Sequence, residues 1–213
     1  MRELVVVGVG AQAKYIVDTY LRLGGLERIS VAYLDAADKG AWAEAAGCCS
    51  ALAETLVAAP PHSARGFIVG HADVDEKKDW FERIAARGHA IVNAIHPGAQ
   101  ISPLATLGRG IIANAGAVVQ PFAKIGDGCI LHAQSSVDHD CDLASFANIA
   151  PGAVLAGWVK VGFGATVSTG AVVIPGVSVG ARAIVGAGAT AIKDVPEGVT
   201  VIGTPARQPL RKG

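Results

Sequence analysis

The chain has 213 residues, 51% hydrophobic and 17% charged, which is long enough for one large domain or two small ones with a substantial core. Eighteen basic and eighteen acidic side chains cancel, which excludes the strongly basic surface typical of proteins that coat nucleic acid. No stretch reaches the roughly 18 uninterrupted apolar residues of a membrane span, and the four cysteines form no CxxC pair, so we expect a cytoplasmic protein with free thiols.

The N-terminal part, residues 1–92, alternates predicted strands and helices. A short apolar segment is followed at once by a glycine loop, and a helical apolar stripe then ends at a glycine pair. The pattern predicts a small parallel sheet with helices on its faces, an α/β Rossmann-like domain. Its predicted elements are the strands Glu3–Val7, Ile29–Leu34 and Gly66–Val69 and the helices Ala11–Leu23 and Val74–Arg87.

The loop Gly8–Ala13 reads G-x-G-x-x-A between a strand and a helix. Glycines let a phosphate approach the backbone, and the helix N-terminus offers free N–H donors. Asp35, at the tip of the second strand, is placed to accept hydrogen bonds from a ribose or a base. The loop fits NAD about as well as any other nucleotide, and a tight turn that packs helix on strand remains an alternative interpretation.

The C-terminal part, residues 93–213, repeats every six residues. Fifteen of the sixteen positions at this spacing from Ile95 to Val185 are Ile, Leu or Val, and the exception is Ala113. The position four residues further on is nearly always small. Neither a helix nor ordinary strand alternation gives this period, so we predict an all-β solenoid in which three hexads close a coil of eighteen residues. Cys129 and Cys141 occupy the small inward positions, which favours core packing over metal binding or nucleophilic chemistry.

One histidine stands out at a corner of the predicted coils. His139 is third in its hexad, and the same column, read at steps of eighteen, holds mostly proline but has Gly157 one coil later. Gly157 leaves side-chain space beside the imidazole and an accessible backbone N–H, an arrangement suited to a thioester and its developing oxyanion.

The whole chain resembles the sialic-acid O-acetyltransferase-like (NeuD/PglD) family of hexapeptide-repeat sugar acetyltransferases. The resemblance implies a left-handed parallel β-helix that forms a homotrimer, with acetyl-CoA between adjacent solenoids and a nucleotide sugar on the N-terminal domain. The residues themselves lead us to expect no metal, because no histidines and cysteines have zinc-ligand spacing, and the charge and apolar patterns lead us to expect no nucleic acid and no membrane. The matching stretches are Gly8–Lys14, Val69–His71, Ile95–Pro97, Val137–Cys141, Ile149–Ala153 and Ile202–Arg207.

The implied reaction is direct transfer of an acetyl group from acetyl-CoA to the amine of a UDP-, GDP- or dTDP-linked 4-amino sugar used in bacterial glycans. His139 is the expected general base, Asp140 its expected carboxylate partner with Asp138 as the other candidate, and His132 the expected contact to the acceptor amine. We expect acetyl-CoA to be bound by Gly157, Ser168, Gly170, Gly186, Ala187, Gly188 and Arg207, and the nucleotide sugar by Gly8, Gly10, Gln12, Asp35, Gly70 and His71.

Three departures from the family pattern bear on the acceptor. Gln12 stands where the family usually has histidine, and His132 and His71 stand where it often has asparagine. The sequence therefore leaves open the nucleotide base, the sugar and the pathway. Alternative functions are O-acetylation of a sialic-acid-like sugar, a non-catalytic nucleotide-binding trimer and, on the glycine loop alone, nicotinamide-dependent reduction.

Overall fold

The computed structural model describes residues 1–34 and 41–209, and the chain divides into two compact units. The N-terminal unit is Met1–Pro97, and the second unit, which we call the solenoid, is Gly98–Gly213. The boundary predicted from the sequence falls slightly earlier, between residues 92 and 93. Over the described ranges, no helix combines the length and the hydropathy needed to cross a bilayer.

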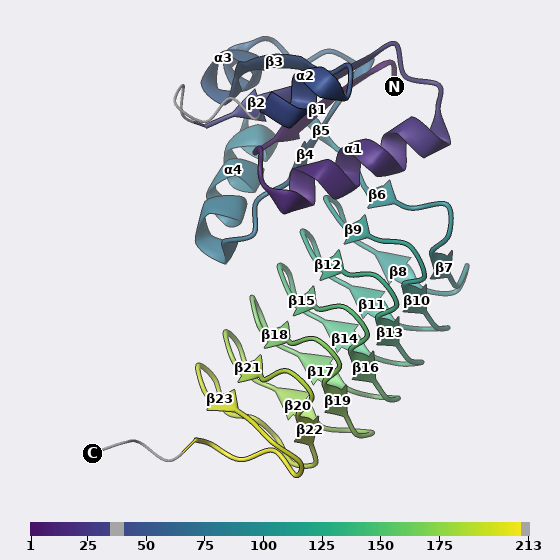
Figure 1. The fold of residues 1–213 in the computed structure, drawn as a ribbon, viewed down its shortest axis with the longest axis vertical. Helices are drawn as coiled ribbons and strands as arrows, with labels where there is room; N and C mark the ends of the chain where they lie inside the picture. The colour runs from purple at the N-terminus through teal and green to yellow at the C-terminus, as the bar shows by residue number, and fades with distance from the viewer. Residues whose placement is uncertain (35–40, 210–213) are drawn as a thin grey trace. The chain divides into compact units, whose positions relative to one another are not determined.

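The N-terminal unit is built on one five-stranded sheet with the order β3-β2-β1-β4-β5 (Figure 1). All neighbouring strands run parallel. The central strand β1 is apolar from Leu4 to Val7, and these four residues have no exposed surface, as its position between two strands requires. The elements are β1 (Glu3–Val7), α1 (Ala11–Leu23), β2 (Arg28–Tyr33), α2 (Ala41–Ala45), β3 (Cys49–Leu52), α3 (Ala53–Ala58), β4 (Arg65–Val69), α4 (Val74–Ala86) and β5 (Ala90–Ile91).

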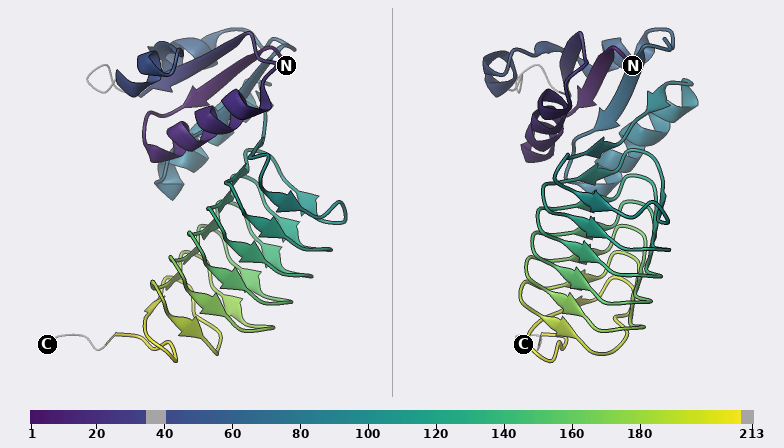
Figure 2. Two further views of the ribbon diagram at one scale, coloured as in Figure 1. Left: turned by 45° about the vertical axis from the view of Figure 1, so that its right-hand side comes forward. Right: turned by 90° about the vertical axis from the view of Figure 1, so that its right-hand side faces the viewer.

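The two long helices of this unit lie on opposite sides of its sheet (Figure 2). Helix α1 follows the glycine loop directly, and α4 begins after Asp73, whose carboxylate accepts hydrogen bonds from the backbone N–H groups of Asp75 and Glu76. Gly70, just after β4, touches α1 so closely that a Cβ atom there would lie 2.9 Å from the backbone of Ala13. A glycine is therefore needed where β4 passes the first turn of α1.

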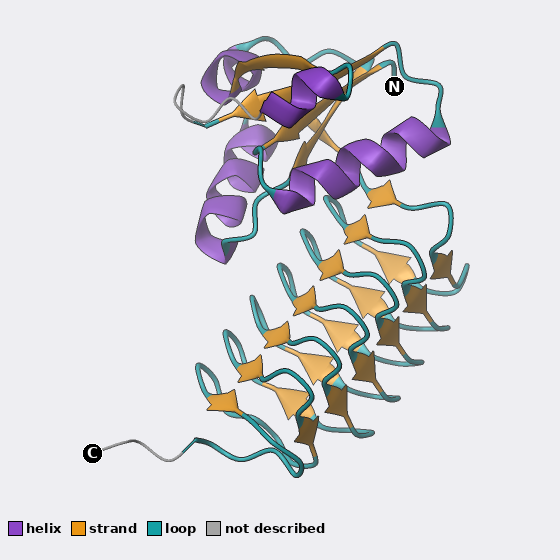
Figure 3. Ribbon diagram, viewed as in Figure 1, coloured by secondary structure: helices purple, strands orange, loops and turns teal. Residues whose placement is uncertain are grey.

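The solenoid consists of short strands joined by tight turns and arranged on three faces (Figure 3). Each strand has two residues. The repeat begins with β6 (Ala94–Ile95), which falls within the range of the N-terminal unit. The strands of the solenoid are β7 (Gln100–Ile101), β8 (Thr106–Leu107), β9 (Ile112–Ala113), β10 (Val118–Val119), β11 (Lys124–Ile125), β12 (Ile130–Leu131), β13 (Ser136–Val137), β14 (Asp142–Leu143), β15 (Asn148–Ile149), β16 (Val154–Leu155), β17 (Lys160–Val161), β18 (Thr166–Val167), β19 (Val172–Val173), β20 (Ser178–Val179), β21 (Ile184–Val185), β22 (Thr190–Ala191) and β23 (Thr200–Val201).

Strands eighteen residues apart pair in parallel and in register, so that Val119 lies beside Val137 and Val137 beside Leu155. The six-residue aliphatic series is buried from Ala113 to Val185. Its first members, Ile95, Ile101 and Leu107, are only half-buried. The sheets run β22-β19-β16-β13-β10-β7 on one face and β20-β17-β14-β11-β8 on the next. The prediction of repeated parallel strands with an aliphatic core is confirmed.

Turn residues stack in three columns, because each column collects one turn from every coil. We name each column an edge, and many of its members have the left-handed backbone that a tight corner requires. The His139 edge, whose turns also carry His139 and Gly157, has Leu104, Phe122, Asp140, Trp158 and Gly176 in this column; the phenylalanine edge has Gly110, Gly128, Phe146, Gly164 and Arg182; the glycine edge has Gly116, Gln134, Gly152, Gly170 and Gly188.

Candidate functional site

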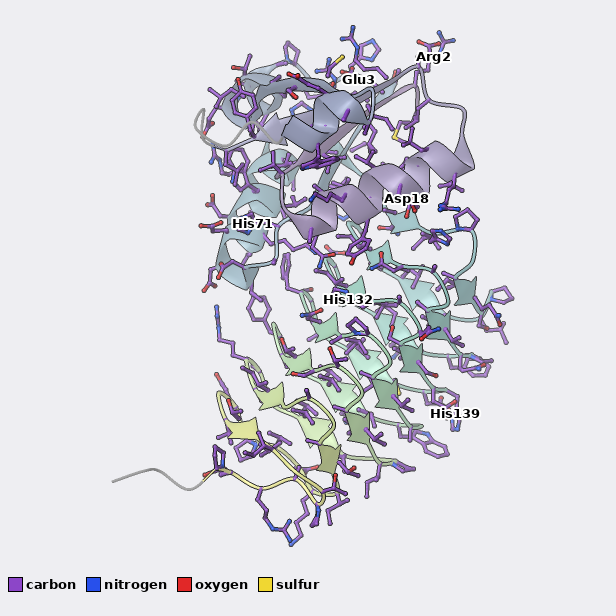
Figure 4. The ribbon with its side chains drawn as sticks, in the orientation of Figure 1. Arg2, Glu3, Asp18, His71, His132 and His139 are labelled. Atoms are coloured by element: carbon purple, nitrogen blue, oxygen red, sulfur yellow. The ribbon has the colours of Figure 1, made fainter. Side chains whose placement is uncertain are left out.

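His139 projects from the turn between β13 and β14, and Figure 4 shows it at the margin of the coils. Its Nδ1 lies 2.8 Å from Oδ2 of Asp140, and both side chains are 41% exposed. Asp138 is engaged differently, because its Oδ1 accepts the backbone N–H of His139 at 2.7 Å. Asp138 therefore binds the backbone of the turn, and Asp140 is the carboxylate that contacts the imidazole. A neutral imidazole whose Nδ1–H donates a hydrogen bond to Asp140 has an unprotonated Nε2 that can accept a proton.

Gly157 lies one coil beyond His139 and keeps the space beside Nε2 open. A Cβ atom at this position would lie 2.7 Å from both Nε2 and Cε1 of His139, which is closer than real Cβ contacts allow. Within residues 1–34 and 41–209, the backbone N–H of Gly157 has no hydrogen-bond partner. The turn therefore offers a basic nitrogen and an N–H donor side by side.

The residue after Gly157 was not identified from the sequence. Trp158 packs its indole against His139, with ring centroids 4.5 Å apart and an interplanar angle of 89°. Its backbone N–H donates to the carbonyl of His139 at 3.1 Å. Trp158 follows Asp140 by eighteen residues, so the periodicity that located Gly157 beside His139 could also have located Trp158.

His132 lies at the end of β12, beside the glycine edge, one edge before His139 along the chain. Figure 4 shows the two histidines at different places on the coils. Strand β13 separates them, and the described structure records no contact between the two side chains within one chain. The predicted catalytic set therefore divides into His139 with Asp140 on one edge and His132 on another.

The residues predicted to bind acetyl-CoA divide in the same way. Gly157 belongs to the His139 edge, whereas the other six residues lie along the glycine edge and at its C-terminal end. Gly170 and Gly188 have left-handed φ angles of 64° and 65°, and the space where a side chain would extend is open. Gly152, which we did not predict, has the same properties, with φ 67° and open space. The six predicted acetyl-CoA residues on or at the end of the glycine edge are Ser168, Gly170, Gly186, Ala187, Gly188 and Arg207.

The C-terminal segment folds back over the end of the glycine edge. The Thr204 hydroxyl donates to the carbonyl of Gly188 at 3.4 Å, and Ala206 N–H donates to the carbonyl of Thr190 at 2.8 Å. Arg207 pairs with Ile202 in an antiparallel bridge, which holds the backbone of the arginine at this end of the glycine edge. Gly186, unlike Gly170 and Gly188, has no open space beside it, because a Cβ atom there would meet Ile202 at 2.8 Å. We attribute this glycine to packing by the C-terminal segment.

A cavity of about 390 Å³ opens at the glycine loop of the N-terminal unit. Gln12 is 8% exposed, and among the described residues its Oε1 has no hydrogen-bond partner. Nδ1 of His71 accepts the backbone N–H of Asp73 at 3.3 Å, which leaves Nε2 to pair with Glu76 at 2.8 Å. The cavity contains five of the six predicted substrate-binding residues, namely Gly8, Gly10, Gln12, Gly70 and His71; Asp35 lies outside the described residues.

The inward cysteines are packed in the core, as their positions predict. Cys129 and Cys141 donate weak hydrogen bonds from Sγ to the carbonyls of Ala144 and Ala156 at 3.2 and 3.1 Å. Burial raises the pKa of the Cys141 thiol to about 11. Among the described residues, no group of three or more His, Cys, Asp or Glu side chains is arranged to hold a metal ion.

Comparison with known proteins identifies relatives along the whole chain, although no family model matches it. The acetyltransferase domain of PglB from Neisseria gonorrhoeae, solved with acetyl coenzyme A, is 32% identical with a TM-score of 0.90, over 98% of this chain and 99% of that chain. PerB from Caulobacter crescentus, solved with CoA and GDP-perosamine, is 32% identical with a TM-score of 0.85, over 97% of each chain. WeeI from Acinetobacter baumannii is 22% identical with a TM-score of 0.78, over 97% of this chain and 99% of that chain, and supports the fold alone.

The raised pKa of Cys141 predicts selective alkylation. At pH 8 the buried Cys141 thiol stays protonated, whereas the Cys49 thiol is exposed. Iodoacetamide should therefore label Cys49 and should modify Cys141 at least about a hundredfold more slowly. Peptide mass spectrometry over a time course measures both rates. Denatured protein is the control, in which both thiols should react. Equal labelling in the folded protein would contradict the burial of Cys141 beside the candidate base.

Proposed function

The chain belongs to the hexapeptide-repeat sugar acetyltransferases of the NeuD/PglD type, and we propose that it transfers the acetyl group of acetyl-CoA to the amine of a nucleotide-linked amino sugar. The observation that carries this proposal is the His139–Asp140 pair beside the open Gly157 position. PerB, a relative of nearly equal length, was solved with CoA and GDP-perosamine, and a histidine-to-alanine variant of a GDP-perosamine N-acetyltransferase from the same organism was solved with the same two ligands. The left-handed sense of the coils is inferred from the same relationship.

Asp140 accepts a hydrogen bond from Nδ1–H of His139 and so leaves Nε2 free to act as a general base. Nε2 takes a proton from the acceptor amine as its nitrogen forms a bond to the thioester carbonyl carbon. The N–H of Gly157 is placed to donate to the oxygen that becomes negative in this step. The carbon–sulfur bond then breaks, and imidazolium returns its proton to the CoA thiolate. No covalent bond to the protein is needed, which agrees with the burial of Cys141.

The division of the predicted residues between two edges supports an assembly with shared sites. One solenoid presents the base on its His139 edge and the open glycines on its glycine edge, and β13 separates the two. A second copy that places its glycine edge against the His139 edge would bring both to one thioester. We propose the homotrimer that the family resemblance implies, with the His139 edge of each subunit against the glycine edge of the next. In this arrangement His132 of the neighbouring subunit approaches the acceptor.

The cavity at the glycine loop is the proposed site of the nucleotide sugar. The first turn of α1 offers backbone N–H donors to a diphosphate. Gln12 Oε1 is a buried acceptor without a protein partner, and a sugar hydroxyl or a base N–H would satisfy it. His71, held by Glu76 and by the N–H of Asp73, forms part of the cavity wall.

The proposed base gives the most direct test. His139→Ala should reduce kcat by about 10²–10⁴-fold, because general-base catalysis contributes this much. Melting should change little, since the side chain is 41% exposed. The assay follows release of the CoA thiol with GDP-, UDP- and dTDP-linked 4-amino sugars, and with matched hydroxyl sugars to separate O-acetylation. His62→Ala, an exposed histidine of the N-terminal unit, is the control. Activity near wild type in His139→Ala would overturn the mechanism.

Mixing two inactive variants tests the shared site. His139→Ala damages one edge, and Ala187→Trp fills the exposed glycine edge near its C-terminal end. In trimers reassembled from an equal mixture, about one site in four combines the intact edge of each variant, so about a quarter of wild-type activity should return. Subunit exchange is followed by native mass spectrometry. Activity that never exceeds the mean of the two separate variants, despite exchange, would show that each subunit carries a complete site.

A ligand panel tests the nucleotide-sugar cavity. A ligand that binds only the folded protein raises its melting temperature, so GDP-, UDP- and dTDP-linked amino sugars should include at least one that stabilises the wild type, while NAD does not. Gln12→Leu should lose most of that shift, because it removes the buried acceptor. Gln120→Leu, an exposed solenoid position, is the matched control. Stabilisation by NAD and by none of the sugars would contradict the assignment.

A further inference from the structure

Neither the conformation of the turn nor packing in the core explains why residue 158 is a tryptophan. We infer that it is a positioning residue for His139, holding the imidazole so that Nε2 stays over the open space at Gly157. The inference rests on the proposed function, because it concerns the base of that reaction.

Two contacts fix the imidazole from different directions. Asp140 meets Nδ1 at 2.8 Å, which orients the ring about that atom but leaves it able to pivot. The indole of Trp158 meets the ring in an edge-to-face arrangement at 4.5 Å, an arrangement that aromatic pairs prefer. The side chain of His139 is 41% exposed, so the remaining surroundings do little to restrain it. Without the indole, the imidazole can rotate away from the acyl position while it keeps its carboxylate.

The turn itself has no need for a tryptophan. Trp158 has a left-handed φ of 60°, which is unfavourable for a residue with a Cβ atom, and the next coil fills the same position with Gly176 at φ 73°. The core does not need it either, because Trp158 is 58% exposed. Residues kept in strained backbone conformations concentrate at functional sites, but Phe122 has the same conformation, so strain alone does not single out Trp158. The contact with His139 is the interaction of the indole that the structure shows within the described residues.

Phe122 provides a matched control on the same edge. It also has a left-handed φ, 63°, and is 59% exposed, but no ring contact joins it to His139 in the part of the chain that the structure describes. An exposed aromatic residue that serves only to cover the edge against a second copy should behave alike at both positions. A residue that positions the base should matter only at Trp158.

Steady-state kinetics on Trp158→Gly, Trp158→Phe and Phe122→Gly test the inference. Trp158→Gly should lower kcat by about 10–100-fold, the effect of a misplaced reacting group, with both KM values within about twofold of wild type. Trp158→Phe should recover most of kcat, because it restores a ring beside the imidazole. Phe122→Gly should keep kcat within about twofold. Light scattering should show the same assembly for all three variants.

An NMR readout reports the contact without depending on turnover. The ring protons of His139, assigned by their loss in His139→Ala, should be shifted by the adjacent indole in the wild type. In Trp158→Gly they should move towards those of an exposed histidine such as His62, while Phe122→Gly leaves them in place.

Several outcomes would overturn the inference. These are unchanged kcat and ring shifts in Trp158→Gly, an equal loss of kcat in Phe122→Gly, or a loss of assembly in both glycine variants. An inactive wild type, or a fully active His139→Ala, would instead remove the proposed function and the inference with it. The two failures are therefore distinguishable.

Discussion

The in-register stacking of eighteen-residue coils is the constraint on which the rest of the solenoid depends. Each two-residue strand is too short to be stable alone, and it persists because its backbone pairs with the coils before and after it while its aliphatic side chain lies on its counterpart, as Val137 does on Val119 and Leu155. The constraint also acts on the turns. A residue's neighbours at an edge are the residues eighteen positions away, so Gly157 lies beside His139 without any insertion or loop to bring it there.

The same constraint separates residues that are close in the sequence. His132 and His139 are seven positions apart, which carries the chain past one strand and onto a different edge. Within one solenoid, the residues predicted for catalysis and for acetyl-CoA therefore lie on two different edges. In the proposed trimer this arrangement ties assembly to chemistry, because the base on one edge meets the open glycines where the His139 edge of one copy contacts the glycine edge of the next.

The sequence predicted the helix Ala11–Leu23 and the strand Glu3–Val7 with the bounds that the structure shows, because both carry clear periodicity and glycine boundaries. It did not predict α2 and α3, whose few residues lack a measurable period. Periodicity placed the Gly157 position beside His139, but it could not show that Asp138 binds backbone while Asp140 binds the imidazole. That choice depends on turn dihedral angles, which a hexapeptide pattern does not encode. The roles assigned to the site residues remain predictions.

The left-handed turn residues show how the fold accommodates function. At Asp140 the conformation is tolerable, since aspartate adopts it more readily than most residues, and it brings the carboxylate to the imidazole of the preceding residue. At Phe146 the cost is offset by packing, because its ring is 8% exposed and fills the space that Gly128 leaves. Trp158 has neither justification: it is not a residue type that favours the conformation, and it is not buried. Phe122 shares both features on the same edge but makes no ring contact with His139 among the described residues, so the feature that distinguishes Trp158 is its edge-to-face contact with the imidazole.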